Sequence, residues 1–277
     1  MKFCRYATND GTRYGVVTSV DGREMITAEI SGPQLQVSQA GVPQRVVLPD
    51  AESATQLEKP VALDQAKVLI PLPLTSKVMC VGKNYAAHVK EFDGEVPKEP
   101  LIFSKPPSSL LAHGGLIVRP GLSQRVDYEG ELAVVIGRTC HRLGENENVR
   151  DYILGYTCLN DVTARDLQRK DGQWTRAKGF DTFCPLGPVI QTELDPWAGV
   201  KVETRVNGEV RQSGTTKDLT FPLEVVIRHI AQFCTLLPGD VIATGTPEGV
   251  GPVVHGDMVE VTVEGIGTLR NAVVDEK

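Results

Sequence analysis

Two glutamates separated by one glycine form the chemical pattern around which the chain is best understood. Glu129, Gly130 and Glu131 precede a run of branched apolar residues that ends at Gly137, and such a run predicts a β-strand entering a core. Side chains two positions apart in a strand share a face, so both carboxylates should point the same way, with Cα atoms roughly 7 Å apart. A hard divalent cation between them would offset their repulsion. The alternative is a solvated strand end with two surface acids.

A third carboxylate lies at another predicted strand end. Residues 155–162 predict a strand that runs directly into a short helix over 163–169, and Asp161 lies at the junction. Together with Glu129 and Glu131 it would complete an all-oxygen site that leaves positions open for water and substrate. Such a site suits Mg²⁺ or Mn²⁺.

Two further segments carry groups that suit a carboxylate substrate. Arg165 and Gln168 are three apart in the predicted helix and share a face, and arginine matches a carboxylate through its planar fork. The alternative for Arg165 is a salt link within the helix. The glycine-rich stretch 245–251 lacks the Gly-Lys-Ser/Thr of a phosphate-binding loop. We interpret it as a substrate-facing loop in which Thr246 donates a hydrogen bond to a substrate carboxylate.

The order of four motifs resembles the fumarylacetoacetate hydrolase family. The resemblance extends over roughly residues 77–274. The motifs are Asp-Tyr-Glu-Gly-Glu-Leu at 127–132, Asn-Asp-Val-Thr-Ala-Arg-Asp at 160–166, Lys-Gly-Phe-Asp-Thr-Phe-Cys-Pro-Leu-Gly-Pro at 178–188, and Pro-Gly-Asp-Val-Ile-Ala-Thr-Gly-Thr-Pro-Glu-Gly-Val-Gly at 238–251.

The resemblance implies roles that an isolated residue would not. It implies that Glu129, Glu131 and Asp161 bind Mg²⁺ or Mn²⁺. It also makes Lys178 an active-site lysine that stabilises negative charge on the substrate, whereas an isolated lysine is usually a solvated surface group. A homodimer formed through the C-terminal domain is a further expectation from the family.

A histidine and a glutamate near the start of this region are candidate catalytic groups. His88 and Glu91 are three apart and would share a face of a helical turn; the alternative is an incidental surface pair. In the hydrolytic branch of the family, such a pair lies on a flexible lid and activates water. The residues that match this lid are Gly82, Asn84, Tyr85, His88 and Glu91.

These features predict a metal-dependent enzyme that acts on a small keto acid. The first hypothesis is hydrolysis of the C–C bond of an acylpyruvate or related β-diketo acid through an enolate stabilised by the metal and Lys178. Residues 80–83 lack the additional acidic ligand of the founding eukaryotic hydrolase, which favours the smaller acylpyruvase-like branch. The alternatives are an isomerase of the 2-hydroxyhepta-2,4-diene-1,7-dioate type, an oxaloacetate decarboxylase, or an inactive metal-binding module.

The composition excludes several other classes. The chain has 277 residues, a net charge of −6 and no basic run, so neither nucleic acid nor an anionic membrane is an expected partner. Residues 1–6 lack the apolar core of a signal peptide, and no apolar run approaches the roughly 20 residues of a membrane span. Six dispersed cysteines without a C-x-x-C pair indicate reduced thiols and a cytoplasmic location.

The expected fold is mostly β with a few helices (α+β), a mixed β-sandwich roll of the family type with a small N-terminal β domain. We place the small domain at residues 1–72 and the catalytic domain at residues 73–277, with the Pro-punctuated stretch 68–74 between them. Apolar spacing predicts one amphipathic helix over 222–235. The predicted strands include 2–7, 14–20, 258–263 and 268–274, and Asn207-Gly208 predicts a hairpin within 201–211.

Overall fold

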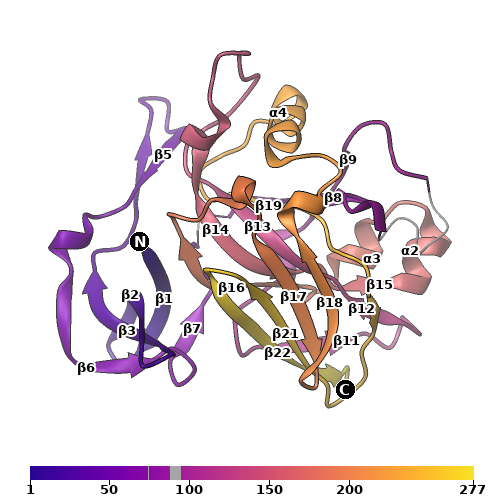
Figure 1. The fold of residues 1–277 in the computed structure, drawn as a ribbon, viewed down its shortest axis with the longest axis horizontal. Helices are drawn as coiled ribbons and strands as arrows, with labels where there is room; N and C mark the ends of the chain where they lie inside the picture. Colours follow the sequence, from indigo (N-terminus) through magenta and orange to yellow (C-terminus); the bar gives the residue numbers. More distant parts are fainter. Residues whose placement is uncertain (74, 88–94) are drawn as a thin grey trace.

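The computed structural model describes residues 1–73, 75–87 and 95–277. The chain is mostly β, with short helices at the edges of the sheets (Figure 1), which confirms the predicted α+β class. The large sheet has twelve strands, ten of them in the order β6-β3-β2-β1-β16-β14-β13-β19-β8-β9, while β7 pairs with β1 and β10 with β16. Its strands are β1 (Lys2–Thr8), β2 (Gly11–Val20), β3 (Arg23–Ile30), β6 (Thr55–Ala62), β7 (Lys67–Leu69), β8 (Val78–Gly82), β9 (Leu101–Lys105), β10 (Leu110–Leu111), β13 (Gly130–Ile136), β14 (Ile153–Asn160), β16 (Cys184–Gln191) and β19 (Val241–Ala243).

The N-terminal strands continue the sheet that carries the later part of the chain. β1 pairs antiparallel with β16 through Lys2 opposite Gln191 and Phe3 opposite Ile190. The indigo and purple strands β1, β2, β3 and β6 form the left part of Figure 1, and β1 joins them to the central strands through β16. The division into units at residue 72 stays a prediction. A separate hairpin is formed by β4 (Gln34–Val37) and β5 (Pro43–Val47).

A second sheet packs against the central strands of the first. Its order is β11-β22-β21-β17-β18. Val134 of β13, Val261 of β21 and Ile227 of helix α4 belong to one buried apolar cluster, so burial holds the two sheets and this helix together. These elements are β11 (Leu116–Arg119), β17 (Lys201–Val206), β18 (Glu209–Thr215), β21 (Met258–Val263), β22 (Gly267–Asp275) and α4 (Leu223–Phe233).

The predicted amphipathic helix and the predicted hairpins are confirmed. α4 begins one residue after Pro222 and buries Leu223, Val226, Ile227, Ile230 and Ala231, the apolar positions of the pattern. The turn between β17 and β18 places both Asn207 and Gly208 at positive φ, as a tight two-residue turn requires. Among the described residues, no helix is long and apolar enough to cross a membrane.

The stretch that carries the two glutamates differs from one continuous strand. β12 (Val126–Tyr128) belongs to a small sheet with β15 (Thr163–Ala164) and β20 (Gly251–Pro252), whereas β13 begins at Gly130 in the large sheet. Glu129 lies where the chain passes between these two sheets. Its N–H therefore donates to the side-chain Oδ1 of Asn160 at 2.9 Å. Two short helices follow nearby, α2 (Arg165–Asp171) and α3 (Thr175–Gly179).

Candidate active site

The three predicted carboxylates meet in one buried cluster. Glu129, Glu131 and Asp161 are exposed by 5%, 2% and 1%, and each offers an oxygen within 4.8 Å of the others. The register between strands explains the meeting, because the start of β13 lies beside the end of β14, with Gly130 opposite Asn160. The chain then brings Asp161 next to Glu129, whose carbonyl accepts the Asp161 N–H at 2.8 Å.

Gly130 permits this arrangement by its lack of a side chain. A Cβ at this position would lie 1.9 Å from Oγ1 of Thr204 and 3.2 Å from Val261, both in the second sheet. A contact of that length cannot be accommodated. The glycine between the two glutamates is therefore required by the close packing of the sheets beneath the site.

Two buried lysines hold the cluster together. Nζ of Lys178, on α3, donates to Oε2 of Glu129 at 2.9 Å and to Oδ2 of Asp161 at 2.5 Å. Nζ of Lys105, at the end of β9, donates to Oδ1 of Asp161 at 2.7 Å and to the carbonyl of Val162 at 3.1 Å. Burial pulls the pKa of Lys178 down, but the charges of Asp161 and Glu129 outweigh burial and raise it above the ordinary value. Lys178 is therefore an ammonium group at neutral pH.

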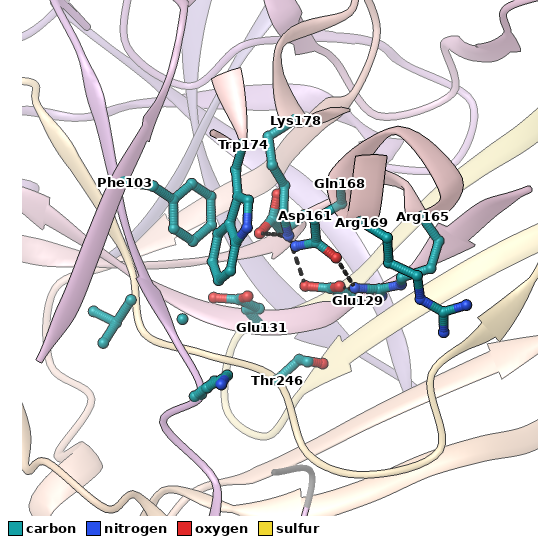
Figure 2. Close-up of a pocket in the computed structure, with 13 residues that line it drawn as sticks. Phe103, Glu129, Glu131, Asp161, Arg165, Gln168, Arg169, Trp174, Lys178 and Thr246 are labelled. Atoms are coloured by element: carbon teal, nitrogen blue, oxygen red, sulfur yellow. Dashed lines mark hydrogen bonds and ion pairs between the residues drawn. The ribbon is translucent and has the colours of Figure 1, made fainter. Parts of the chain in front are cut away.

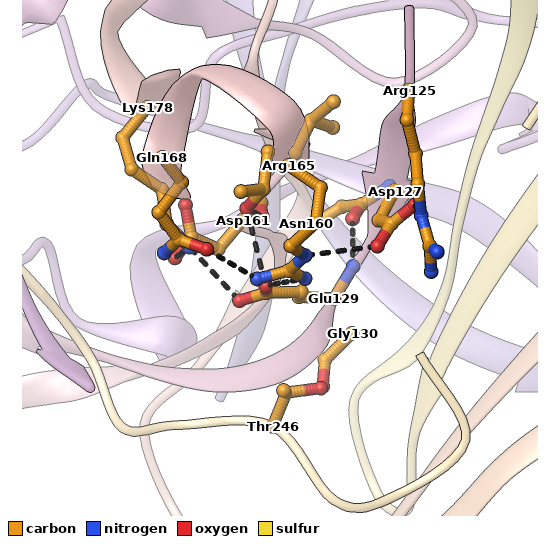
Figure 3. A network of polar contacts seen from close by, with 12 residues as sticks. Arg125, Asp127, Glu129, Gly130, Asn160, Asp161, Arg165, Gln168, Lys178 and Thr246 are labelled. Carbon is orange, nitrogen blue, oxygen red and sulfur yellow. Dashed lines mark hydrogen bonds and ion pairs between the residues drawn. The ribbon is translucent and has the colours of Figure 1, made fainter. Parts of the chain in front are cut away.

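Arg165 links the cluster to the start of α2 (Figure 3). Its Nε donates to Oδ2 of Asp127 at 2.9 Å, and its guanidinium also pairs with Oε1 of Glu129. A third donor, Nη1, reaches Oε1 of Gln168 at 2.7 Å. Arg165 therefore does more than form a salt link within its helix, because it joins α2 to β12 and to the carboxylate cluster.

Glu131 is the carboxylate with the least compensation. Its Oε2 accepts the N–H of Gly245 at 2.7 Å, and no lysine or arginine in the described part of the chain forms an ion pair with it. Burial raises its pKa well above the usual value, and the charges of Asp161 and Glu129 raise it further. Gly245 has φ of 104° and lies so close to Asn84 that an added Cβ would approach to 2.8 Å, so glycine is needed to present this N–H.

The carboxylates line a pocket with a volume of about 330 Å³, enough for a small organic acid. Figure 2 shows Phe103 and Trp174 on one side of it, Arg165 and Arg169 on the other, and the carboxylates between them. The two aromatic rings meet edge to face with centroids 5.1 Å apart. Trp174 also packs so closely on Gly82 that a Cβ there would come within 2.7 Å of its ring.

The structure places the other predicted residues as follows. Gln168 and Thr246 both line the pocket. Oε1 of Gln168 accepts from Arg165, which orients its amide group. The Thr246 hydroxyl donates to the carbonyl of Gly130 at 2.8 Å and accepts from Gln212 at 2.7 Å. His88 and Glu91 lie outside the described residues, so their catalytic roles stay predictions.

The donor set fits a hard divalent cation. All three candidate ligands are carboxylates, and Glu131 in particular is a buried acid that a metal would keep ionised. Glu129, Glu131 and Asp161 would hold such a cation, and the assignment of Mg²⁺ or Mn²⁺ stays a prediction. The identity of the ion rests on ligand chemistry alone.

Several residues of the site were not predicted from the sequence. Lys105, Phe103, Trp174 and Arg169 line or support the pocket, but they come from separate segments without a shared spacing. Lys105 offered one weak signal, because it ends a strand immediately before two prolines. Its burial to 1% exposure depends on the pairing of β9 with β8, which periodicity does not reveal.

The raised pKa of Glu131 predicts how the metal-free protein responds to pH. A carboxyl whose pKa is raised on folding binds its proton more tightly in the folded state. The contribution to the free energy of unfolding is therefore fully present below the ordinary glutamate pKa and is lost as pH rises through the raised value. Thermal melting in a chelator should show that the stability of the unmodified protein falls with rising pH relative to that of Glu131→Gln. Saturating Mg²⁺ should abolish this pH-dependent difference. A difference between the two proteins that does not change with pH would contradict the prediction.

Comparisons with known proteins agree with the geometry. The family described as "Fumarylacetoacetate (FAA) hydrolase C-terminal" matches residues 77–274. Oxaloacetate tautomerase YisK of Bacillus subtilis is 41% identical over 225 residues, which cover 76% of this chain and 74% of that protein. The crystal structure of 5-carboxymethyl-2-hydroxymuconate delta-isomerase from Mycobacterium smegmatis is 43% identical with a TM-score of 0.82, and the alignment covers 100% of both chains.

A third relative is named as a hydrolase, unlike the tautomerase and the isomerase above. The structure of the fumarylacetoacetate hydrolase of psychrophilic Exiguobacterium antarcticum is 40% identical with a TM-score of 0.80, again over 100% of both chains. The matching region spans the carboxylate cluster, both buried lysines and the glycine-rich loop. The predicted resemblance is thereby confirmed, and the chain belongs to the fumarylacetoacetate hydrolase family.

Proposed function

We propose that the protein is a metal-dependent isomerase that interconverts the keto and enol forms of a 2-oxo acid such as oxaloacetate. The observation that carries this proposal is the ammonium group of Lys178, held by Glu129 and Asp161 in the floor of a pocket of organic-acid size. An enolate needs stabilising positive charge that is fixed in place before the reaction. The names of the tautomerase and isomerase relatives support the same class of reaction.

The chain's own residues supply binding, orientation and charge. In this reaction the C3–H bond breaks, the electron pair moves toward the C2 oxygen, and a proton ends on that oxygen. A bound divalent cation would supply Lewis acidity at the 2-oxo group. Lys178 would supply a second positive charge to the same oxygen. The amide of Gln168, whose Oε1 is held by Arg165, would donate its N–H to the substrate carboxylate. Either Glu91 or His88 is our candidate for the base that removes the C3 proton.

Hydrolysis of an acylpyruvate is the second candidate function. It is the first hypothesis from the sequence, because His88 and Glu91 match the water-activating pair of the hydrolytic branch, and the name of the Exiguobacterium relative supports it. We prefer isomerisation to hydrolysis because isomerisation requires only the charged pocket floor and one base, whereas hydrolysis also requires an activated water molecule. The cluster serves an oxaloacetate decarboxylase equally well, since loss of CO₂ also leaves an enolate.

One experiment separates these reactions. The protein is first treated with a chelator and then supplied with Mg²⁺ or Mn²⁺, and it is assayed on oxaloacetate for enol decay and for CO₂ release, and on acetylpyruvate for C–C cleavage. We expect metal-dependent acceleration of enol decay that exceeds the other two rates. Full activity after exhaustive chelation, or acetylpyruvate cleavage as the fastest reaction, would overturn the proposal.

Glu91→Gln tests the hydrolytic alternative directly. A general base contributes about 10²- to 10⁴-fold to a rate, so hydrolysis that uses Glu91 to activate water should fall by that factor. Decarboxylation needs no attacking water and should survive better. Metal affinity, measured by calorimetry, should stay near normal in the variant. If acetylpyruvate is cleaved at an unchanged rate, Glu91 does not activate water for that reaction.

A further inference from the structure

Among the described residues, the side chains that line the pocket carry more positive than negative charge. Its charged lining residues are Lys83, Arg165, Arg169, Lys178, Glu129, Glu131 and Asp161. Among these, the bases exceed the acids by one, and a divalent cation would raise the excess to three. Behind the lining, Lys105 pairs with Asp161, and Asp127 pairs with Arg165 and Arg125, so these groups add no net negative charge. A pocket with this charge matches a substrate that carries more than one negative group.

Arg169 is a basic group that forms no internal polar contact with the described part of the chain. Arg165 and Lys178 are committed to Asp127, Glu129 and Asp161 through buried ion pairs. Arg169 is exposed at the pocket wall, and within residues 1–73, 75–87 and 95–277 no ion pair or hydrogen bond engages its guanidinium. The group is therefore available to a ligand without the loss of an internal contact.

The helix places this guanidinium at a defined distance from the reacting end. Arg165 and Arg169 are four residues apart on α2, slightly more than one turn and about 6 Å along the axis. Arg165 contacts the carboxylate floor, so Arg169 lies further out on the same side. Figure 2 shows it beyond Arg165, on the side opposite Phe103 and Trp174. A small acid with its 2-oxo end at the carboxylate cluster would bring its far end to Arg169 if it extended along α2.

We infer that Arg169 is a specificity-determining residue that binds the second, distal carboxylate of a dicarboxylic 2-oxo acid. The inference rests on the proposed function for the placement of the 2-oxo end. The planar guanidinium can bind a carboxylate through two parallel N–H donors. A substrate without the distal carboxylate gains nothing from this residue, so Arg169 sets the preference for dicarboxylates over monocarboxylates.

The test compares two substrates that differ only at the distal group. Oxaloacetate has a carboxylate at C4, and its 4-methyl ester has a neutral group there. We expect Arg169→Gln to lower kcat/KM for oxaloacetate by about ten- to hundredfold, the effect of a lost charge-assisted hydrogen bond, with most of the change in KM. The ester should change by less than about twofold. The matched control is Lys170→Gln, which removes one positive charge from the next, exposed position of α2 and should leave both substrates unaffected.

If the protein turns over neither substrate, that result counts against the proposed function alone. A binding measurement then still tests the role of Arg169. Calorimetry with Mg²⁺ present compares 2-oxoglutarate with 2-oxopentanoate, which has a methyl group in place of the distal carboxylate. Arg169→Gln should weaken binding of the first by about tenfold or more and leave the second unchanged. Equal losses on both members of a pair, no loss on either, or a selective loss in Lys83→Gln instead of Arg169→Gln would overturn the inference.

Discussion

Replacing Lys178 by methionine should abolish most turnover while strengthening metal binding. Removal of one preorganised donor to a developing oxyanion typically costs about 10²- to 10³-fold in kcat, and we expect a loss of that size on oxaloacetate. Metal affinity should rise, because the ammonium group that now lies 2.9 Å from Glu129 and 2.5 Å from Asp161 repels an incoming cation. A residue that served only to hold the fold would not produce these opposite changes.

The same substitution should affect stability differently with and without metal. Without metal, Lys178→Met removes one positive partner from each of Glu129 and Asp161, which then keep Arg165 and Lys105, respectively, as basic partners among the described residues. We expect the free energy of unfolding to fall by up to about 3 kcal/mol, the lower range for breaking a buried pair. Mg²⁺ should restore most of this loss, since the cation replaces the missing positive charge between the carboxylates.

Three measurements check these expectations: kcat on oxaloacetate, metal affinity by calorimetry, and thermal melting with and without Mg²⁺. Lys170→Met, at an exposed position on α2, provides a lysine-to-methionine control that should leave all three unchanged. Turnover within a fewfold of the unmodified protein would show that Lys178 does not stabilise the reacting oxygen. Weaker metal binding would show that it positions the ligands rather than competing with the cation.

The residues of this site that the sequence predicts are those whose pattern extends over only a few neighbouring positions of the chain. Glu129 and Glu131 are separated by one residue, and Asp161 directly follows a strand whose apolar pattern is clear, so both features are visible in the chain itself. What brought them together was the register of β13 against β14, which apolar patterns do not specify. The same limit explains the break at Glu129, where the chain changes sheets.

The cationic part of the site depends still more on long-range pairing. Lys105 reaches Asp161 only because β9 pairs with β8 at the edge of the large sheet, and an isolated lysine in sequence is usually a surface group. Lys178 was identified through the motif resemblance and not through its spacing. Arg169 offered no signal, since the role proposed for it depends on the absence of a partner among the residues that the structure describes.

Glu131→Gln should separate metal binding from folding. The glutamine preserves the shape of the side chain, and its amide oxygen can still accept the N–H of Gly245. It removes a buried charge that has no basic partner among the described residues, so the metal-free protein should be at least as stable as the unmodified one at neutral pH. Affinity for Mg²⁺ or Mn²⁺ should fall by more than about 100-fold, because even substitutions one shell further out cost up to that much.

Asp161→Asn is the informative partner for this variant, because its carboxylate is paired with two buried lysines. Both variants should lose metal affinity, as each removes one of three charged ligands. Without metal, the two substitutions should change the free energy of unfolding in opposite directions. The asparagine leaves the charges of Lys105 and Lys178 with fewer partners, whereas the glutamine removes a carboxylate that has no basic partner among the described residues. Calorimetry with Mn²⁺ and melting curves in a chelator measure the two effects separately. Unchanged metal affinity in Glu131→Gln would remove this residue from the ligand set. Equal destabilisation by the two variants would show instead that Glu131 is compensated by a positive charge in the folded protein.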